Sequence, residues 1–197
     1  MIDSDMKISR RVVRELCYRM VEKNCGFQIR SQVISFTLID VCTGLGLKVA
    51  GEKVDLEKES SESQLKSLFG SNRIIITMIY EELIKSVNDC IVVDFCKLYI
   101  LLGLSEFLLP NTKGIVCSEL FILVDNLDEL CKYNWDGTVY EYLVRSLCEA
   151  ASSILNETIS SYVYIVGCTY LLQVIFIVSS KVKYLLVNNC CVVDVLL

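Results

Sequence analysis

The sequence contains no histidine among its 197 residues, so the commonest general base and the commonest metal-binding side chain are both missing. Its eleven cysteines include no Cys-x-x-Cys pair, which argues against a structural zinc site. We also find no P-loop and no Gly-x-Ser-x-Gly nucleophile motif. We therefore expect no catalytic residues, no cofactor and no metal site, and we predict that the protein is not an enzyme.

Proline is almost absent too, and the single one, Pro110, leaves long helices uninterrupted on either side of it. Apolar residues make up 53% of the chain, enough to bury a core in one compact domain over 1–197. The net charge is −5, but residues 1–53 hold nine Lys/Arg against six Asp/Glu. An acidic body argues against nucleic-acid binding by the whole chain, whereas the basic N-terminal part leaves local binding open.

The cysteines and the N-terminal residues both indicate the cellular compartment in which the protein is expected. Five of the cysteines fall inside apolar helical patterns, where thiols behave as small buried hydrophobic groups. The first fourteen residues are charged rather than apolar, so no secretory signal is expected. These features favour reduced thiols in a cytosolic or nuclear protein.

The first predicted helix spans residues 4–23 and carries a basic cluster. One side of it is apolar, and the other holds Lys7, Arg10, Arg11 and Arg14. Such a cluster is a candidate nucleic-acid contact through phosphate groups. The alternative is an ordinary solvated helix surface.

A short β-hairpin is predicted next, because residues 27–29 and 33–36 alternate in the manner of strands. Thr37, followed by Asp40, has the pattern of a helix N-cap, and the helix should end at Gly46. Gly51 then marks a turn. The glycine spacing differs from that of a dinucleotide-binding loop, so we assign Gly46 and Gly51 structural roles.

Three further segments complete the middle of the chain. Residues 57–66 are polar and serine-rich, which predicts a mobile loop. Residues 73–87 read as a helix, although their β-branched start could equally begin as a strand. Residues 91–108 are apolar nearly all round, which predicts a helix buried in the centre of a bundle.

Two amphipathic helices are predicted around the only tryptophan, over residues 117–131 and 135–149. They are joined by a short polar corner that contains Tyr133. We expect Trp135 to be buried between the two helices, with Asp136 on the outer, solvated face. The fold class predicted from the whole chain is mainly α, a helical bundle with a short β-hairpin near the N-terminus.

The last apolar segment allows two interpretations. Residues 158–180 carry no formal charge and are long enough to span a bilayer. Several polar positions, including Thr169 and Gln173, favour a buried core helix instead. A membrane-anchored remnant that uses 158–180 as a transmembrane helix is therefore the alternative.

Several stretches in order resemble the plant mobile domain family, the aminotransferase-like group that includes MAIN-like and transposon-encoded plant proteins. The resemblance covers residues 12–173. The family usually has tryptophan where this chain has Met20, and an acidic residue with tryptophan beyond Gln173, which indicates a truncated copy. The matching stretches are 13–17 (VRELC), 36–41 (FTLIDV), 44–52 (GLGLKVAGE), 99–103 (YILLG), 107–110 (FLLP), 127–130 (LDEL), 133–135 (YNW), 139–143 (VYEYL), 147–148 (LC) and 167–173 (GCTYLLQ).

This resemblance implies a nuclear, transposon-derived protein linked to meristem maintenance and to the silencing of transposable elements. It also implies unknown protein partners, and nucleic acid as a partner of the N-terminal basic helix. Aminotransferase chemistry is not expected, because no lysine here has the setting of a pyridoxal-phosphate Schiff base. A membrane location belongs only to the alternative.

Overall fold

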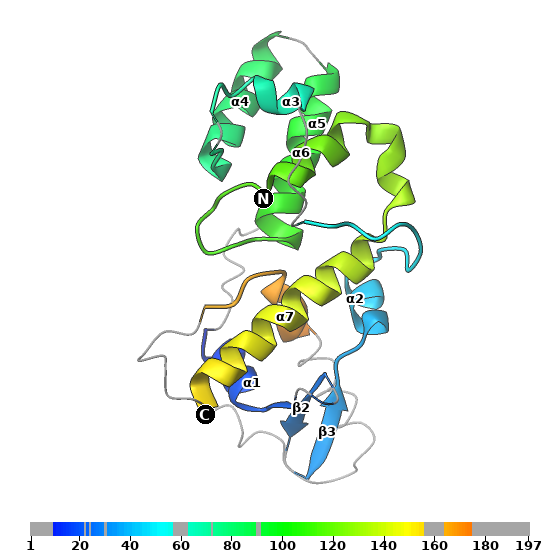
Figure 1. Cartoon of the computed structure of the whole chain (residues 1–197), viewed down its shortest axis with the longest axis vertical. Helices are drawn as coiled ribbons and strands as arrows, with labels where there is room; N and C mark the ends of the chain where they lie inside the picture. The colour runs from blue at the N-terminus through cyan, green and yellow to red at the C-terminus, as the bar shows by residue number, and fades with distance from the viewer. Residues whose placement is uncertain are drawn as a thin grey trace, which may run out of the picture.

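The protein is mainly α-helical, as predicted, with one small antiparallel sheet near the N-terminus. The computed structural model describes residues 10–21, 23, 25–29, 31–56, 63–71, 73–89, 92–155 and 164–174. Helices α3 to α6 gather at one end of the molecule, and α1, α2, the sheet and the long α7 form the other end (Figure 1). The elements are α1 Arg10–Tyr18, β1 Met20–Val21, β2 Gly26–Ile29, β3 Gln32–Ser35, α2 Leu38–Leu45, α3 Gln64–Ser67, α4 Ile76–Asp89, α5 Val92–Gly103, the π-helix η2 Leu104–Leu108, α6 Ser118–Asp125, the 3-10 helix η3 Leu127–Lys132 and α7 Trp135–Leu155.

The N-terminal part confirms the hairpin and shortens the first helix. β2 and β3 pair antiparallel, with Phe27 opposite Ile34, as the alternation predicts. The prediction of a helix to residue 23 is wrong, because α1 ends at Tyr18 and Met20 pairs with Phe27 as a third strand. Residues 4–9 of that predicted helix lie outside the described residues.

Helix α2 begins and ends where the sequence predicts. The Asp40 carboxylate accepts hydrogen bonds from the backbone N and the Oγ1 of Thr37, both at 2.7 Å. Gly46 closes the helix in the left-handed conformation, with φ at 67°, and its N–H donates to the Cys42 carbonyl at 2.8 Å. Tyr140 of α7 packs on Phe36 just before this helix, with ring centroids 5.4 Å apart.

The turn at Gly51 makes a contact that the sequence does not reveal. Glu52 donates its N–H to the Lys132 carbonyl at 2.7 Å and accepts from the Asn134 N–H at 2.8 Å. A side chain at Gly51 would collide with the Lys132 carbonyl and lie 2.7 Å from the carbonyl carbon of Tyr133. The predicted structural residues Gly51 and Tyr133 therefore meet at the corner that precedes Trp135.

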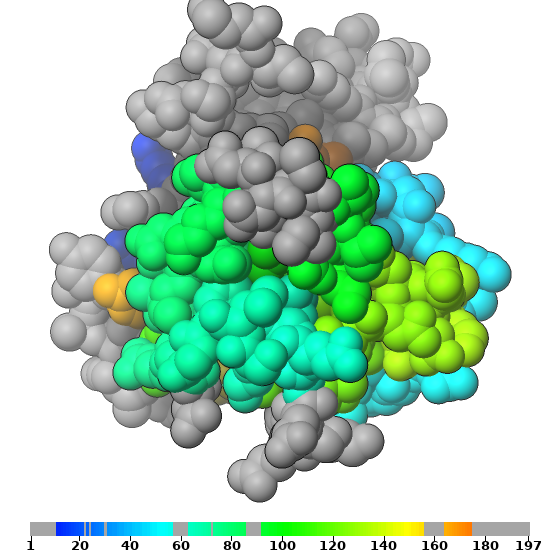
Figure 2. Space-filling view, turned by 90° about the horizontal axis from the view of Figure 1, so that it is seen from above, coloured from blue at the N-terminus to red at the C-terminus, as the bar shows by residue number. Residues whose placement is uncertain are grey.

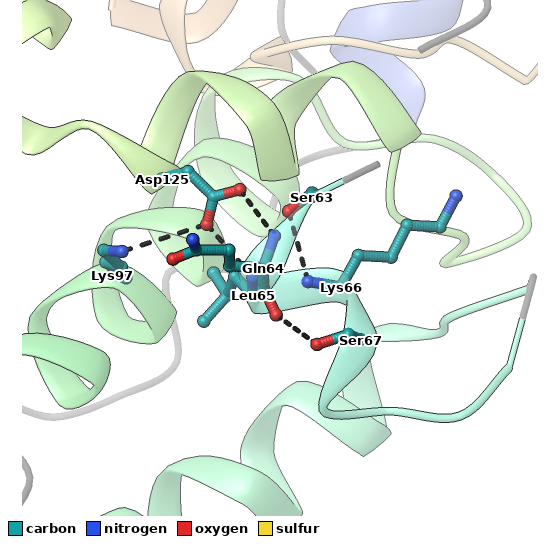
Figure 3. A network of polar contacts seen from close by, with 7 residues as sticks. All are labelled: Ser63, Gln64, Leu65, Lys66, Ser67, Lys97 and Asp125. Atoms are coloured by element: carbon teal, nitrogen blue, oxygen red, sulfur yellow. Dashed lines mark hydrogen bonds and ion pairs between the residues drawn. The ribbon is translucent and has the colours of Figure 1, made fainter. Parts of the chain in front are cut away.

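Part of the predicted mobile loop is an ordered helix. Residues 57–62 lie outside the described residues, but Ser63 caps α3 by accepting from the Lys66 N–H at 3.2 Å. The Asp125 carboxylate at the end of α6 accepts from the backbone N–H groups of Gln64 and Leu65, at 2.9 and 3.0 Å (Figure 3). Leu65 is 2% exposed, so this end of the loop prediction is wrong.

Helices α4 and α5 pack against each other, and α5 is less buried than predicted. The β-branched stretch at 74–77 is divided, because Ile75 forms an isolated antiparallel bridge with Ile115 and α4 begins at the next residue, Ile76. In α5, Leu98 and Leu101 are fully buried, but Val92 and Tyr99 are 70% and 63% exposed. The expectation of a helix buried on all sides is therefore wrong, since one side of α5 remains exposed.

The predicted pair of helices around Trp135 is correct in type but not in length. The first helix, α6, ends at Asp125, and the 3-10 helix η3 follows, which leaves Cys131 exposed. Trp135 is half-buried rather than buried between two α-helices. Its Nε1 donates to the Leu130 carbonyl at 2.8 Å, and its ring meets that of Tyr133 edge-on at 6.1 Å.

Residues 164–174 lie on α7, but they do not form the continuous helix predicted for 158–180. Residues 158–163 and 175–180 of that prediction lie outside the described residues. Residues 164–168 are not helical, Gly167 has φ at +95°, and only residues 169–174 are helical in the described part. Leu171 and Leu172 are buried, and the Val166 N–H donates to the Ser146 hydroxyl at 2.8 Å. Within the described ranges, none of the helices combines the length and apolar character needed to cross a membrane.

Helix α7 supplies the centre of the core. Val139, Leu143 and Leu147 have no exposed surface, in agreement with the predicted stripe at helical spacing. Its N-terminus is capped by the Asn134 side chain, which accepts from the Gly137 N–H at 2.8 Å. Asp136 was predicted to be solvated, but it is fully buried, and neither carboxylate oxygen has a hydrogen-bond partner.

The close approach at Gly51 predicts a large loss of stability for Gly51→Ala. We expect a loss of ~3 kcal/mol in the free energy of unfolding, because the new Cβ must displace the backbone at 132–134 and φ is +133°. Gly46→Ala is the matched control. Its position also has positive φ, but it has open space around it, so ~1 kcal/mol is expected. Urea unfolding followed by circular dichroism measures both, and equal losses would contradict the contact.

The buried Asp136 predicts a pH-dependent stability penalty. Burial raises the pKa of its carboxyl above the usual 3.8, so the folded protein holds this proton more tightly than the unfolded chain does. Stability contributed by this group is therefore lost as pH rises through the raised pKa, and is recovered as pH falls. We expect Asp136→Asn to be more stable than wild type at pH 7, with a difference that shrinks toward pH 4. The control Glu149→Gln, at an exposed position on α7, should show no such trend, and a pH-independent Asp136→Asn difference would contradict the assignment.

Candidate functional site

One pocket of about 520 Å³ lies beside α7 and is the main candidate site in the described part of the chain. Its walls come from α7, from residues 53–56, from Ser105 near the start of the π-helix and from residues 109–120. The turn at Gly51 holds residues 53–56 in place, because Glu52 is hydrogen-bonded on both sides to the corner that begins α7. Its volume lies within the range of small-molecule sites.

The mouth of the pocket carries charges of both signs. Lys53 and Asp55 come from the segment after the turn, and Glu141 and Arg145 come from one face of α7, four residues apart. All four residues are exposed, and the Lys53 Nζ lies 2.8 Å from the Glu141 Oε2. The mouth therefore holds two cations and two anions, with no net charge.

Apolar side chains form the floor. Val54, Leu109 and Leu120 are 6%, 5% and 1% exposed, and Leu56 and Ile115 are half-buried beside them. The pocket therefore changes from charged at its mouth to apolar at its floor, a pattern common in sites for small ligands.

The polar groups on the walls differ in how far their hydrogen bonds are satisfied. Asn111 donates to the Ile115 carbonyl at 2.6 Å and accepts from the Lys113 N–H at 3.0 Å. The Thr138 hydroxyl donates to the Asn134 carbonyl at 2.8 Å. The Ser105 hydroxyl is buried without a partner. Ser105 lies in the π-helix η2, a widened turn of a kind that is frequent at functional sites.

The two ionisable groups in the wall are not activated for chemistry. Burial raises the pKa of the Cys117 thiol, which donates to the Leu56 carbonyl at 3.3 Å. Burial likewise raises the pKa of the Tyr142 phenol. A reactive thiol or a phenolic base needs a lowered pKa, so neither Cys117 nor Tyr142 is activated in this way.

A second candidate surface is the exposed apolar part of α4 and α5. We define the α4–α5 apolar face as Tyr80, Ile84, Val92, Val93 and Tyr99, which are 43% to 70% exposed. Helices α3, α4 and α5 together cover the end of the molecule seen in Figure 2, in teal and green. Contiguous apolar patches mark binding surfaces, and the contact between α4 and α5 makes this face a candidate for one.

The predicted nucleic-acid contacts are only partly described. Lys7 lies outside the described residues, as does the side chain of Arg10 at the start of α1. Arg11 and Arg14 are exposed, and the Arg14 guanidinium lies 5.7 Å from the centroid of the Tyr18 ring. The basic face therefore includes an exposed aromatic ring that the sequence pattern did not single out.

Sequence reasoning did not find the pocket, although a signal was present. Glu141 and Arg145 are opposite charges four residues apart on the outer face of a helix, but such pairs are usually simple surface ion pairs. In the described ranges, no group of three or more Cys, Asp or Glu residues is placed to hold a metal ion. The residues predicted as structural, Gly51 and Tyr133, lie at the edge of the segment that forms the pocket wall.

Comparison with known proteins gives a family without a stated activity. The family model described as a domain of unknown function (DUF8566) matches residues 2–173, most of the chain. No curated protein and no solved structure shows significant similarity. The matched range contains the stretches that resemble the plant mobile domain family, and that resemblance stays a prediction. The chain belongs to the family defined by the domain of unknown function DUF8566.

Proposed function

We propose that this protein is a non-catalytic interaction domain that binds a protein partner through the α4–α5 apolar face. The observation that carries the proposal is the exposure of Ile84, Val92 and Tyr99, at 67%, 70% and 63%. Complete burial of one large apolar side chain stabilises a complex by roughly 1.5–3 kcal/mol, so a few of them can supply the apolar centre of an interface.

The surroundings of this face are consistent with an interface that has a polar rim. Glu81 and Lys85 of α4 are exposed close to Ile84 in sequence, and Lys85 pairs with Glu82 at 2.9 Å. Tyr80 donates its hydroxyl to Glu106 at 2.6 Å, which fixes the ring at the surface. An apolar centre surrounded by charged groups is typical of protein–protein contacts.

The cellular setting that we propose rests on the sequence resemblance. A transposon-derived protein similar to plant mobile domain proteins would act in the nucleus, in meristem maintenance or in the silencing of transposable elements. Such a role requires partners rather than turnover, and the raised pKa values of Cys117 and Tyr142 are compatible with it.

If a protein partner binds the α4–α5 apolar face, charged residues introduced into this face should abolish the binding. A photo-crosslinking amino acid at position 99 would be used in plant nuclear extract, with wild type compared with Ile84→Glu/Val92→Glu. We expect at least a tenfold lower crosslink yield, because a desolvated carboxylate at an apolar interface costs more than ~1.4 kcal/mol.

The matched control for this experiment is Ile39→Glu on α2, which changes an apolar residue that is 71% exposed on a different element. It should retain the crosslink. Equal yields from all three proteins would contradict the proposal, as would the absence of any protein crosslinked at position 99.

A second candidate function is local contact with nucleic acid through α1. Arg11, Arg14 and the exposed Tyr18 combine cations with an aromatic ring, as single-strand binding surfaces do. The acidic remainder of the chain should confine such contact to this helix.

If α1 binds nucleic acid, the salt dependence of the affinity should come from the basic residues of this helix. We expect the affinity for single-stranded DNA to fall with salt, and each lost phosphate contact to lower the slope by about 1. The variant replaces Lys7, Arg10, Arg11 and Arg14 by glutamate. Its control replaces exposed Lys48 and Lys53 in the same way. Identical salt slopes for wild type and the quadruple variant would contradict this candidate.

A further inference from the structure

We propose that the pocket beside α7 binds a small zwitterion with an apolar tail, of the chemical class of free apolar α-amino acids. The pocket and the α4–α5 apolar face share no residue, so this inference does not depend on the proposed partner binding. Three features of the pocket favour this ligand class: the charges at its mouth, its apolar floor and one buried hydroxyl.

The balance of charges at the mouth selects a zwitterion. Two cations, Lys53 and Arg145, stand with two anions, Asp55 and Glu141, and all four side chains reach solvent. A simple anion would meet as many repulsive as attractive groups, and so would a simple cation. A molecule with one ammonium and one carboxylate can face an opposite charge at each end.

The spacing on α7 suits adjacent charges on the ligand. Glu141 and Arg145 are one helical turn apart, so their Cβ atoms are about 5–6 Å from each other. The ammonium and carboxylate of an α-amino acid are attached to the same carbon and can approach both side chains together. The Arg145 guanidinium can bind a carboxylate with two parallel hydrogen bonds, which fixes its orientation.

The existing ion pair at the mouth is compatible with exchange. Lys53 and Glu141 are 74% and 50% exposed at the side chain, so their attraction is weakened by water. A ligand ammonium can therefore share Glu141 with Lys53 at small cost. When binding expels water from the pocket, the attraction between these side chains and the charged groups of the ligand becomes stronger.

The floor indicates an apolar tail. Leu56 and Ile115 of the lining are only half-buried, so they keep apolar surface in contact with water, and a tail that covers them exchanges this water for apolar contact. The volume of about 520 Å³ is ample for an aromatic or branched side chain. At the wall, the Ser105 hydroxyl has no partner in the protein, which is rare for a buried polar atom and consistent with a site that is completed by an occupant.

The experiment is isothermal titration of the full chain with L-phenylalanine. N-acetyl-L-phenylalanine, which lacks the ammonium, and L-phenylalaninamide, which lacks the carboxylate, are the matched ligands. We expect a dissociation constant of about 1 mM or lower for the amino acid, and at least tenfold weaker binding of both analogues, since each lacks one charge contact. Bound amino acid should also raise the melting temperature.

Three variants locate the binding. Arg145→Gln and Glu141→Gln should each lower the affinity for L-phenylalanine at least tenfold. Glu149→Gln changes an exposed residue of α7 outside the pocket lining, so this variant should bind as wild type does. Circular dichroism confirms that each variant is folded. Equal binding of all three ligands, unchanged binding by both pocket variants, or no saturable heat up to about 10 mM amino acid would overturn the proposal.

Discussion

The structure depends on one backbone contact, the pairing of Glu52 with the chain at Lys132 and Asn134. Two hydrogen bonds, at 2.7 and 2.8 Å, join a turn in the first third of the chain to the corner that opens α7. Only glycine can precede this contact, because a Cβ at residue 51 would occupy the space of the opposite backbone. The contact fixes both the pocket wall at 53–56 and the direction of α7, so the two structural predictions for Gly51 and Tyr133 have one physical cause.

Helix α7, which begins at this contact, contributes both to the core and to the pocket. Its fully buried residues, Val139, Leu143 and Leu147, hold α1, α2 and residues 164–174 in the core, and its exposed side carries Glu141 and Arg145 to the pocket mouth. The same helix contains a destabilising feature, the buried carboxylate of Asp136 without a hydrogen-bond partner. A favourable N-terminal helix dipole partly offsets that cost. Core packing and site construction therefore share one element.

The two candidate surfaces have different chemistry and different positions. The pocket combines balanced charges with an apolar floor, whereas the α4–α5 face is apolar with charged residues around it. Asp125 pairs with the partly buried Lys97 of α5 at 3.8 Å and accepts from the N-terminus of α3, so it ties α3, α5 and α6 together (Figure 3). Burial raises the pKa of the Cys117 thiol and of the Tyr142 phenol beside the pocket, so neither of these two groups is an activated nucleophile.

The sequence by itself determined the helical class, the hairpin, the capped helix α2 and the buried stripe of α7, because these follow from local periodicity and capping chemistry. It did not determine where α1 and α6 end. The chain leaves the α-helical path at Tyr18 and Asp125 because strand pairing and the capping of α3 compete successfully there. Nor could it give the pocket, whose residues are distant in sequence and meet only when Glu52 reaches Lys132. Tertiary structure also decided which apolar side of α5 stays exposed and that Asp136 is buried, since composition cannot specify which neighbour covers a given face.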